Sequence, residues 1–441
     1  MLCASPASAQ DEIPNPLTLQ DALRLALERN PSVASAQADV RAREAALSGQ
    51  QARRLPTLTA SMTAGMQRSL PRAADADGGA AGAARGTSET SDLALTLAHS
   101  FWQSGRKEAI ASGREQVLCS RASLEDTRRQ LLLSVATTWH TILSQQELAA
   151  VADEAVRAAQ QHLELVDARM AAGTAAPADR LPIEAELAEA RCELVSTVNA
   201  VWQSLAQLQA LLALPPDTLP VLSGADEVAF AAGELQTWVA EALSERPDLA
   251  AQRNQLRVAQ LALRQAEIGA GLSFEVQGQA EYGRFTGTDG NTWALSAGVS
   301  FPLFDRTASA QVAQAEASLE SSRGRLAELE LSVTREVSQA WHALTDASER
   351  VTSAEASLAA ATSTLEAAQA RYALGAASVI DLTDAELTRR QAAARLVQAR
   401  YDRNVAHYEL LAAAGRLLTE GQSDHPDAQQ GAREAVAEGV Q

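Results

Sequence analysis

The sequence predicts a mainly α-helical fold with membrane β-structure, built as a tandem repeat of long coiled-coil helical hairpins and two β-hairpins. Three observations lead to this prediction. The 441-residue chain repeats its own landmarks in order. Its Ala-rich segments carry an apolar residue at every seventh position, and four shorter segments alternate apolar and polar residues instead. A period of seven is typical of supercoiled helices, whereas a period of two is typical of strands.

The internal repeat is clearest around a glycine. The segment ARMAAGTAAPADR at 168–180 returns as ARYALGAASVIDL at 370–382, so that Gly173 and Gly375 are 202 positions apart. Other landmarks match in the same order, which indicates a duplication. The two repeats are expected at residues 10–220 and 221–418.

Each repeat contains a long helix with one apolar line. In both copies its members are spaced by seven: Val135, Ile142, Ala149, Val156, Leu163 and Met170, then Val337, Leu344, Val351, Leu358, Leu365 and Tyr372. A strict heptad line forms the seam of a left-handed supercoil. We therefore expect two long helical hairpins.

The turns of these hairpins carry residues typical of helix ends. Gly173 and Gly375 are expected to end the outgoing helices, because glycine readily adopts the left-handed conformation after a helix. Pro177 and Ser378 are expected to open the returning helices, as an N1 proline and an N-cap serine. The turns thus lie at 173–177 and 375–378.

Two β-hairpins are expected at about 57–102 and 273–302. In the fourth strand Trp293, Leu295, Ala297, Val299 and Phe301 share one face, and small or polar residues share the other. Strands of about ten residues are long enough to cross a bilayer when tilted. The alternative is a soluble hairpin with one face on a core. Four strands cannot close a barrel, so a membrane location requires several chains to share one.

Composition excludes some classes of protein. Apolar residues make up 46% and aromatic residues 4%, and the net charge of −18 argues against a nucleic-acid partner. No run of 18 apolar residues occurs, so no transmembrane helix is expected. Residues 1–9 are interpreted as a signal-peptide remnant, with a disordered cytosolic tail as the alternative. Residues 419–441 are expected to form a disordered tail.

The arrangement of these segments resembles one known family. Two helical hairpins, two β-hairpins, FPLFDR at 301–306 and YALGAASVIDLTDAEL at 372–387 are similar in order to the TolC-type outer-membrane efflux proteins. The resemblance covers residues 17 to about 418. The FPLFDR segment is most similar to the subgroup that serves heavy-metal exporters of the cobalt–zinc–cadmium type.

The resemblance implies an assembly, partners and a location. It implies a homotrimer with a twelve-stranded barrel in outer-membrane lipid and a twelve-helix periplasmic tunnel. The expected function is that of a passive channel in a tripartite efflux or export system, which confers drug or heavy-metal resistance. The implied partners are a periplasmic adaptor (membrane fusion) protein and an inner-membrane pump. The implied location is the cell outer membrane, with a long periplasmic extension.

The resemblance also implies a gate at the helical turns, which closes like an iris. Asp381 and Asp384 match the family's two gate aspartates. Tyr372 and Asp179 match a tyrosine and an aspartate that link neighbouring helices when the gate is shut. The arginine that completes this link falls on Ala377, so the closed state is expected to be held differently.

The same carboxylates have a simpler interpretation as helix caps. Ser378 and Asp381 form an S-x-x-D capping box, and Asp179 follows Pro177 in a first helical turn. Asp384 lies one turn further and has no capping role. In a trimer Asp381 and Asp384 would form a ring that attracts cations, and crowding would raise their pKa values.

The sequence predicts no enzyme, metal site or cofactor. The six histidines include no H-x-x-x-H pair, and Cys119 and Cys192 lack metal-ligand spacing. Neither G-x-S-x-G nor a P-loop occurs. His140 and His342 follow matched tryptophans on the heptad helices, where packing is the expected role. Two alternatives to a channel stay open, a soluble periplasmic coiled-coil scaffold and an adaptor protein.

Overall fold

The computed structural model describes most of the chain. The described residues are 16–68, 87–173, 176–215, 217–218, 220–224, 233–269, 271–285, 288–301, 306–374 and 376–417. Four expected features lie outside them: the signal-peptide remnant, the C-terminal tail, Gly375 and most of the FPLFDR segment. The chain forms two compact units, and each takes segments from both repeats. The repeat boundaries at 10–220 and 221–418 therefore stay a prediction.

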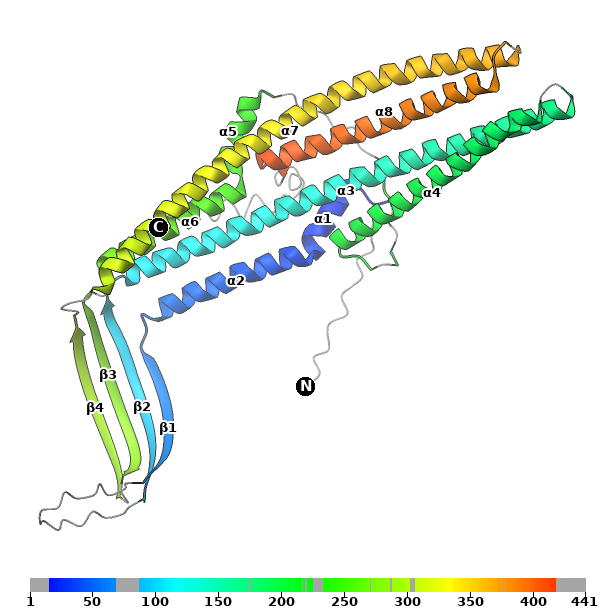
Figure 1. Ribbon diagram of the computed structural model, residues 1–441. Coiled ribbons are helices and arrows are strands. Elements are labelled where there is room, and N and C mark those ends of the chain that lie inside the picture. Colours follow the sequence, from blue (N-terminus) through cyan, green and yellow to red (C-terminus); the bar gives the residue numbers. More distant parts are fainter. Residues whose placement is uncertain are drawn as a thin grey trace, which may run out of the picture. The chain divides into compact units, whose positions relative to one another are not determined.

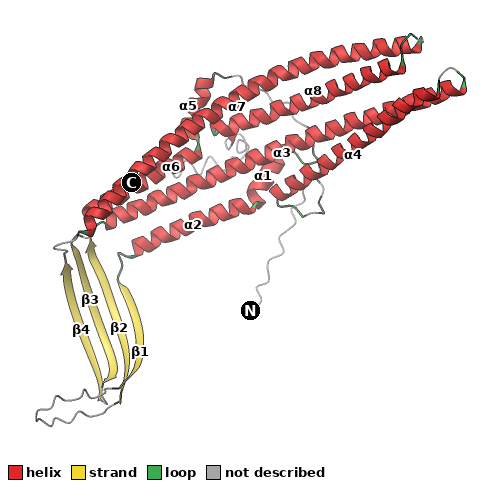
Figure 2. Ribbon diagram, viewed as in Figure 1, coloured by secondary structure: helices red, strands yellow, loops and turns green. Residues whose placement is uncertain are grey.

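The order of the elements repeats, as the duplication predicts (Figures 1 and 2). The first copy contains α1 (Leu19–Arg29), α2 (Pro31–Ala52), β1 (Thr57–Arg68), β2 (Thr87–Gln103), α3 (Arg106–Ala171), a 3-10 turn (Pro177–Asp179) and α4 (Arg180–Leu211). The second contains α5 (Leu235–Glu245), α6 (Pro247–Ile268), β3 (Ser273–Phe285), β4 (Thr288–Ser300), α7 (Thr307–Ala373) and α8 (Val379–Ala414). The two longest helices have 66 and 67 residues.

One compact unit, Asp39–Arg121 with Ala251–Leu326, contains the β-structure. Its four strands form a single antiparallel sheet in the order β1-β2-β3-β4. Both predicted hairpins are present, and β2 also pairs with β3. The strands have 12, 17, 13 and 13 residues, more than the ten expected. Pairing extends past the alternating segments because backbone hydrogen bonds do not require apolar side chains.

The apolar positions of all four strands fall in register on one face. Leu58 pairs with Leu97, which pairs with Gly278, which in turn pairs with Leu295. The next row across the sheet is Ala60, Leu95, Ala280 and Trp293. Leu295 is 73% exposed and Trp293 is 84% exposed. A single chain thus leaves a wide apolar face uncovered, whereas a soluble protein would bury such a face.

One polar residue interrupts this face. His99 pairs with Val276, and its ring lies 4.2 Å from that of Phe101, centroid to centroid. A register shift follows, and it places Trp102 opposite Phe274. His99 therefore packs against an aromatic ring near the end of β2.

The other unit contains the helical hairpins, Ala122–Ala250 and Ala327–Gln441 together with Met1–Ala38. Helices α3 and α4 run side by side, as do α7 and α8 (Figure 1). Val156 of α3 packs against Leu187 and Ala190 of α4. Val351 of α7 packs against Leu396 and Ala399 of α8. The predicted heptad lines thus form the seams of both hairpins.

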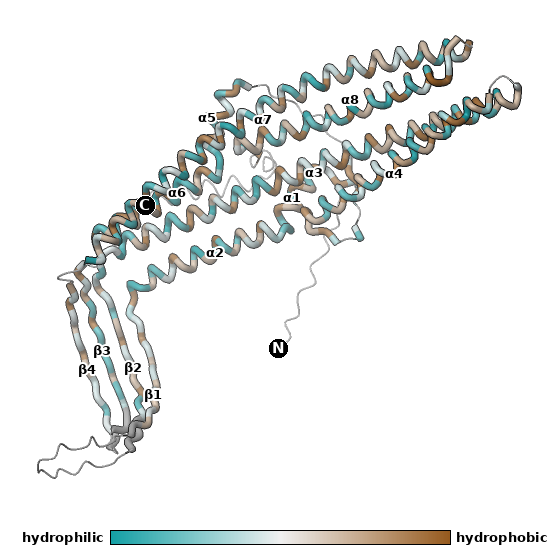
Figure 3. The backbone as a smooth tube through the Cα atoms, viewed as in Figure 1, coloured by the Kyte–Doolittle hydropathy of each residue, from teal (hydrophilic) through white to brown (hydrophobic). Residues whose placement is uncertain are grey.

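The largest core of this unit surrounds Trp139 of α3. Val135 and Ile142, two members of the heptad line, are fully buried beside it, together with residues of α1 and α4. Along each long helix, apolar and polar residues are interspersed (Figure 3). Within the described residues, no helix combines the length and apolar character needed to cross a membrane.

Candidate functional site

The turn between α7 and α8 is held by the predicted capping box. The backbone N–H of Asp381 donates to Ser378 Oγ over 3.1 Å, and the N–H of Ser378 donates to Asp381 Oδ2 over 2.9 Å. The Ser378 hydroxyl also donates to Asp381 Oδ2 over 3.0 Å. These reciprocal bonds satisfy donors that the start of a helix would otherwise leave unpaired.

The cap sets the ionisation of Asp381. Its hydrogen bond from the Ser378 backbone and that from the Ser378 hydroxyl hold the pKa of the carboxyl below its usual value, and Arg371 acts in the same direction. Crowding of carboxylates in a trimer is expected to raise the pKa of Asp381, whereas the contacts within one chain lower it. A charge-stabilising cap keeps Asp381 ionised at neutral pH.

Asp384, unlike Asp381, does not cap the start of a helix. Its side chain is exposed, and within the described structure its carboxylate forms no hydrogen bond or ion pair. Its backbone carbonyl accepts a bond from the Thr388 hydroxyl, over 2.8 Å. A charged group without a structural partner is available to act on ions or on another chain.

The turn between α3 and α4 is built differently. Gly173 follows α3 with φ of +73°, the left-handed conformation expected of it. Pro177 opens a 3-10 turn, and α4 proper begins three residues later, at Arg180. Asp179 accepts a hydrogen bond from the N–H of Ala176, over 3.0 Å. The predicted proline start is thus separated from the α-helix by a single tighter turn.

Within the described residues of one chain, Tyr372 and Asp179 form no hydrogen bond with each other. Tyr372 is 7% exposed and packs with Leu382 and Ala385 of α8. The guanidinium carbon of Arg169, at the end of α3, lies 4.3 Å from the centroid of its ring. A cation over a tyrosine face is attracted by the ring's electrons. Within one chain, therefore, Tyr372 links α7 to Arg169 of α3, a contact that sequence reasoning missed.

A second contact that sequence reasoning missed closes the first hairpin near its turn. Arg180 Nε, at the start of α4, donates to Asp167 Oδ1 of α3 over 2.8 Å. Arg180 also contacts Glu184 one helical turn further along α4. Both pairs are exposed to solvent, where an ion pair contributes little stability but can favour one geometry.

A polar cluster lies on three helices of the same unit. His162 Nε2 of α3 is 3.0 Å from Glu386 Oε1 of α8, and Glu186 of α4 is the third member. The hydrogen bond that His162 donates to Glu386 raises the pKa of His162, although burial opposes it. Burial, together with the charge of Glu386, raises the pKa of Glu186. These residues lie far apart in sequence and form no motif.

Comparison with known proteins identifies the chain's family. The sequence model described as "Outer membrane efflux protein" matches residues 22–214 and 238–416. The chain belongs to this family. It is similar to the outer membrane efflux protein BepC of Brucella suis, with 24% identity over 317 residues, 70% of this chain and 69% of the relative. It is also similar to the pyoverdine export outer membrane protein OpmQ of Pseudomonas putida, with 26% identity over 409 residues, 89% of this chain and 85% of the relative.

The fold of this outer membrane efflux protein agrees with that family. The crystal structure of CusC matches it with a TM-score of 0.77 at 19% identity, over 90% of this chain and 92% of that one. The protein is therefore an efflux channel of the outer membrane with a long periplasmic helical extension. This assignment decides against both the soluble scaffold and the adaptor.

The two histidines that follow the matched tryptophans of the efflux protein, His140 and His342, lie in different surroundings. His140 is 1% exposed, and its ring packs near Tyr408, with 5.3 Å between centroids. Burial, and to a smaller extent the charge of His407, lowers the pKa of His140 to about 4, so that the ring is neutral at pH 7. His342 is exposed and packs edge-on against Trp341. The expected packing role thus describes His140 better than His342.

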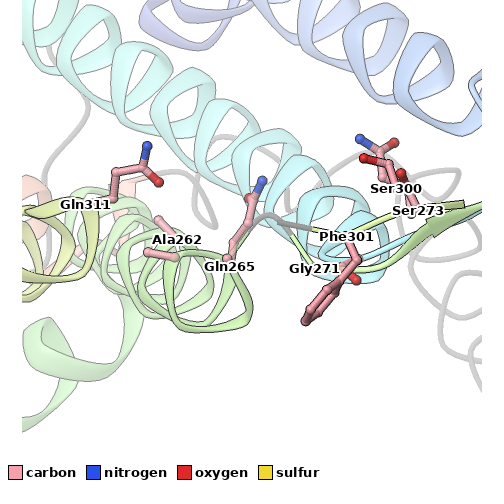
Figure 4. Close-up of a pocket in the computed structure, with 11 residues that line it drawn as sticks. Ala262, Gln265, Gly271, Ser273, Ser300, Phe301 and Gln311 are labelled. Atoms are coloured by element: carbon pink, nitrogen blue, oxygen red, sulfur yellow. The ribbon is translucent and has the colours of Figure 1, made fainter. Parts of the chain in front are cut away.

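A polar cavity of about 620 Å³ lies in the unit that contains the sheet (Figure 4). Gln265 of α6 and Ser300 and Phe301 at the end of β4 line it. A Cβ atom at Gly271 would lie 2.5 Å from Ser104 Oγ, so glycine lets two connections between strands and helices approach closely. Its described lining residues carry hydroxyl and amide groups and no ionisable side chain. The cavity marks the place where strands give way to helices.

Proposed function

We propose that this efflux protein works as a homotrimer, in which three chains contribute their four-stranded sheets to one twelve-stranded barrel. The free edges of the sheet carry the proposal. In the order β1-β2-β3-β4, the outer edges of β1 and β4 have no partner strand within the described residues. In lipid, each unpaired N–H or C=O group costs several kcal/mol. Pairing β1 of one chain with β4 of the next removes every free edge.

The two faces of the sheet support the same arrangement. The apolar rows that contain Leu295 and Trp293 would meet lipid. The opposite face carries Glu275, Gln277 and Glu281, which would line a water-filled lumen. Outer-membrane barrels have this division between an apolar exterior and a polar interior.

The partners we propose are a periplasmic adaptor protein and an inner-membrane pump, as in a tripartite efflux system. Membership of the efflux family supports them. Large apolar side chains at the helical turns give further support: Leu374 is 84% exposed, Leu181 65% and Ile380 61%. Exposed apolar residues gathered at one end of a helical assembly are typical of a docking surface.

We place the gate of the channel at the same turns. Asp381 and Asp384 of each chain would form a ring of negative charge that binds cations. The contact between Arg169 and Tyr372 would hold one chain's hairpins together in the closed state, in place of the link through Asp179 that the resemblance implies. Because Ala377 occupies the arginine position of that link, a different cation must supply the charge.

Cysteine cross-linking tests the trimer. In a background without the native cysteines, one cysteine at Thr59 of β1 is combined with one at Thr292, Ala294 or Ser296 of β4. At least one pair should cross-link between chains and give dimer and trimer bands, with none larger. Thr59 lies on the polar face, so lipid does not shield it.

The control is a pair on the two inner strands, Thr96 with Gln279, which face each other within one chain. This pair should give only an intramolecular product. Monomer alone from all three test pairs, or a ladder that continues past three chains, would contradict the closed trimer.

A further inference from the structure

The polar cluster of His162, Glu186 and Glu386 has the geometry of a ligand set. One potential ligand atom of each residue lies within 4.8 Å of the others. The His162 and Glu386 side chains are only 16% and 13% exposed. The three residues line a cavity of about 250 Å³ between α3, α4, α7 and α8.

Two buried atoms of this cluster lack partners. Neither His162 Nδ1 nor Glu186 Oε2 forms a hydrogen bond within the described part of the chain. A buried polar atom without a partner costs about 1–3 kcal/mol and calls for an explanation. An ion bound to Glu186 would supply one for its Oε2.

The neighbouring arginines do not fill this role. Arg389 lines the same cavity, but its guanidinium lies 3.1 Å from Glu154. Arg390 also lines the cavity and its charge acts on Glu186, but its Nε lies 4.0 Å from Glu193. Both arginines therefore have partners outside the cluster, and they leave its inner oxygens to another cation.

We propose that His162, Glu186 and Glu386 bind one divalent first-row metal ion, and that zinc(II) is the ion the ligand set fits best. One imidazole and two carboxylates match the nitrogen and oxygen ligands of zinc sites and leave a fourth position for water. Magnesium and calcium prefer oxygen ligands alone, and copper(I) prefers sulfur. Two carboxylates and a neutral imidazole also balance the charge of the ion.

The side chains need only small movements to reach coordination distances. Ligand atoms around tetrahedral zinc are about 3.4 Å apart, since each bond is about 2.0–2.2 Å long. His162 and Glu386 already approach to 3.0 Å. Glu186 is the residue that must move, and its side-chain torsions allow a shift of about 1 Å.

A bound ion would tie α8 to the hairpin of α3 and α4. A small cavity lined by both His162 and Tyr372 places the cluster directly beside the Arg169–Tyr372 contact. The proposal rests on ligands from a single chain, and so it does not depend on the trimer or on the partners.

Zinc binding to purified full-length protein tests the site. The protein carries no histidine tag, is treated with chelator and is titrated in detergent against a chromophoric competitor. We expect one zinc ion per chain at this cluster. Both His162→Ala and Glu186→Gln should weaken zinc binding at least about tenfold. Mutation of a residue that only hydrogen-bonds a metal ligand already has an effect of that size, and loss of the ligand itself should cost more.

Two matched variants serve as controls. His342→Ala removes an exposed imidazole from α7, and Glu164→Gln removes an exposed carboxylate from α3. Both should bind zinc like the wild type, and circular dichroism should show equal helix content in all variants. A wild-type chain that takes up no zinc, or a His162→Ala variant that binds equally well, would overturn the proposal. Channel conductance would be unaffected by that outcome, and so the proposed function would stand.

X-ray absorption of the bound zinc gives an independent result. Nitrogen and oxygen neighbours at about 2.0 Å are expected from this ligand set. Sulfur neighbours would instead assign the ion to one of the chain's three cysteines, Cys3, Cys119 or Cys192, and would also overturn the proposal.

Discussion

Asp381→Asn combined with Asp384→Asn should leave a channel with little preference for cations. In the wild type, two carboxylates from each of three chains would surround one constriction. At ordinary salt, their summed attraction enriches monovalent cations by roughly tenfold. The double variant should lose this enrichment, together with block by multivalent cations added on the periplasmic side. Single-channel recording in planar bilayers measures both effects.

Asparagine keeps the structural role separate from the charge. Its side-chain oxygen can still accept the N–H of Ser378, so the cap that Asp381 forms is retained. Asp402→Asn removes an equal charge from an exposed position further along α8 and should change neither selectivity nor block. If the double variant behaved like the wild type, the two aspartates would be helix-capping and surface residues only.

Leu295→Arg should prevent assembly of the barrel. Leu295 lies in the central apolar row, opposite Gly278, and is 73% exposed in the single chain. An arginine facing lipid near the middle of the bilayer costs about 2–4 kcal/mol, and three chains would bear that cost together. Outer membranes should therefore contain little heat-resistant trimer of this variant, as measured by electrophoresis without boiling.

Gln277→Arg is the matched control, since residue 277 faces the other side of the sheet. Gln277 lies on β3, next to Gly278, which pairs with Leu295. An arginine there would enter the proposed water-filled lumen, and so trimer should form at the wild-type level. Equal assembly of both variants would show that the apolar face does not contact lipid.

The two faces of the sheet could be predicted because the alternation that defines them lies within each strand's own sequence. Alternation along each strand predicts which side chains share a face, and Leu58, Leu97 and Leu295 do lie on one face; the register that aligns them comes from the structure. The capping box was predictable for the same reason, because Ser378 and Asp381 are only three residues apart. The register shift beyond Ser100 was not predictable, since it depends on how β2 meets β3.

The polar contacts between helices could not be predicted from the sequence. The heptad lines indicate which faces meet, but not which polar side chains lie opposite one another at each level. Arg169 over Tyr372 depends on the packing of α3 beside α7, whose ends are about 200 residues apart in sequence. The cluster of His162, Glu186 and Glu386 likewise joins three helices, and no spacing rule relates its members.

Thiol labelling at two positions of the sheet tests the central claim most directly. Leu295→Cys and Gln277→Cys are compared in intact outer membranes, in a background without native cysteines, with a water-soluble maleimide. A barrel with its apolar face in lipid predicts rapid labelling at 277 and little at 295, with both positions reacting after denaturation. Labelling at 295 as fast as at 277 would contradict the claim that this sheet lies in the membrane.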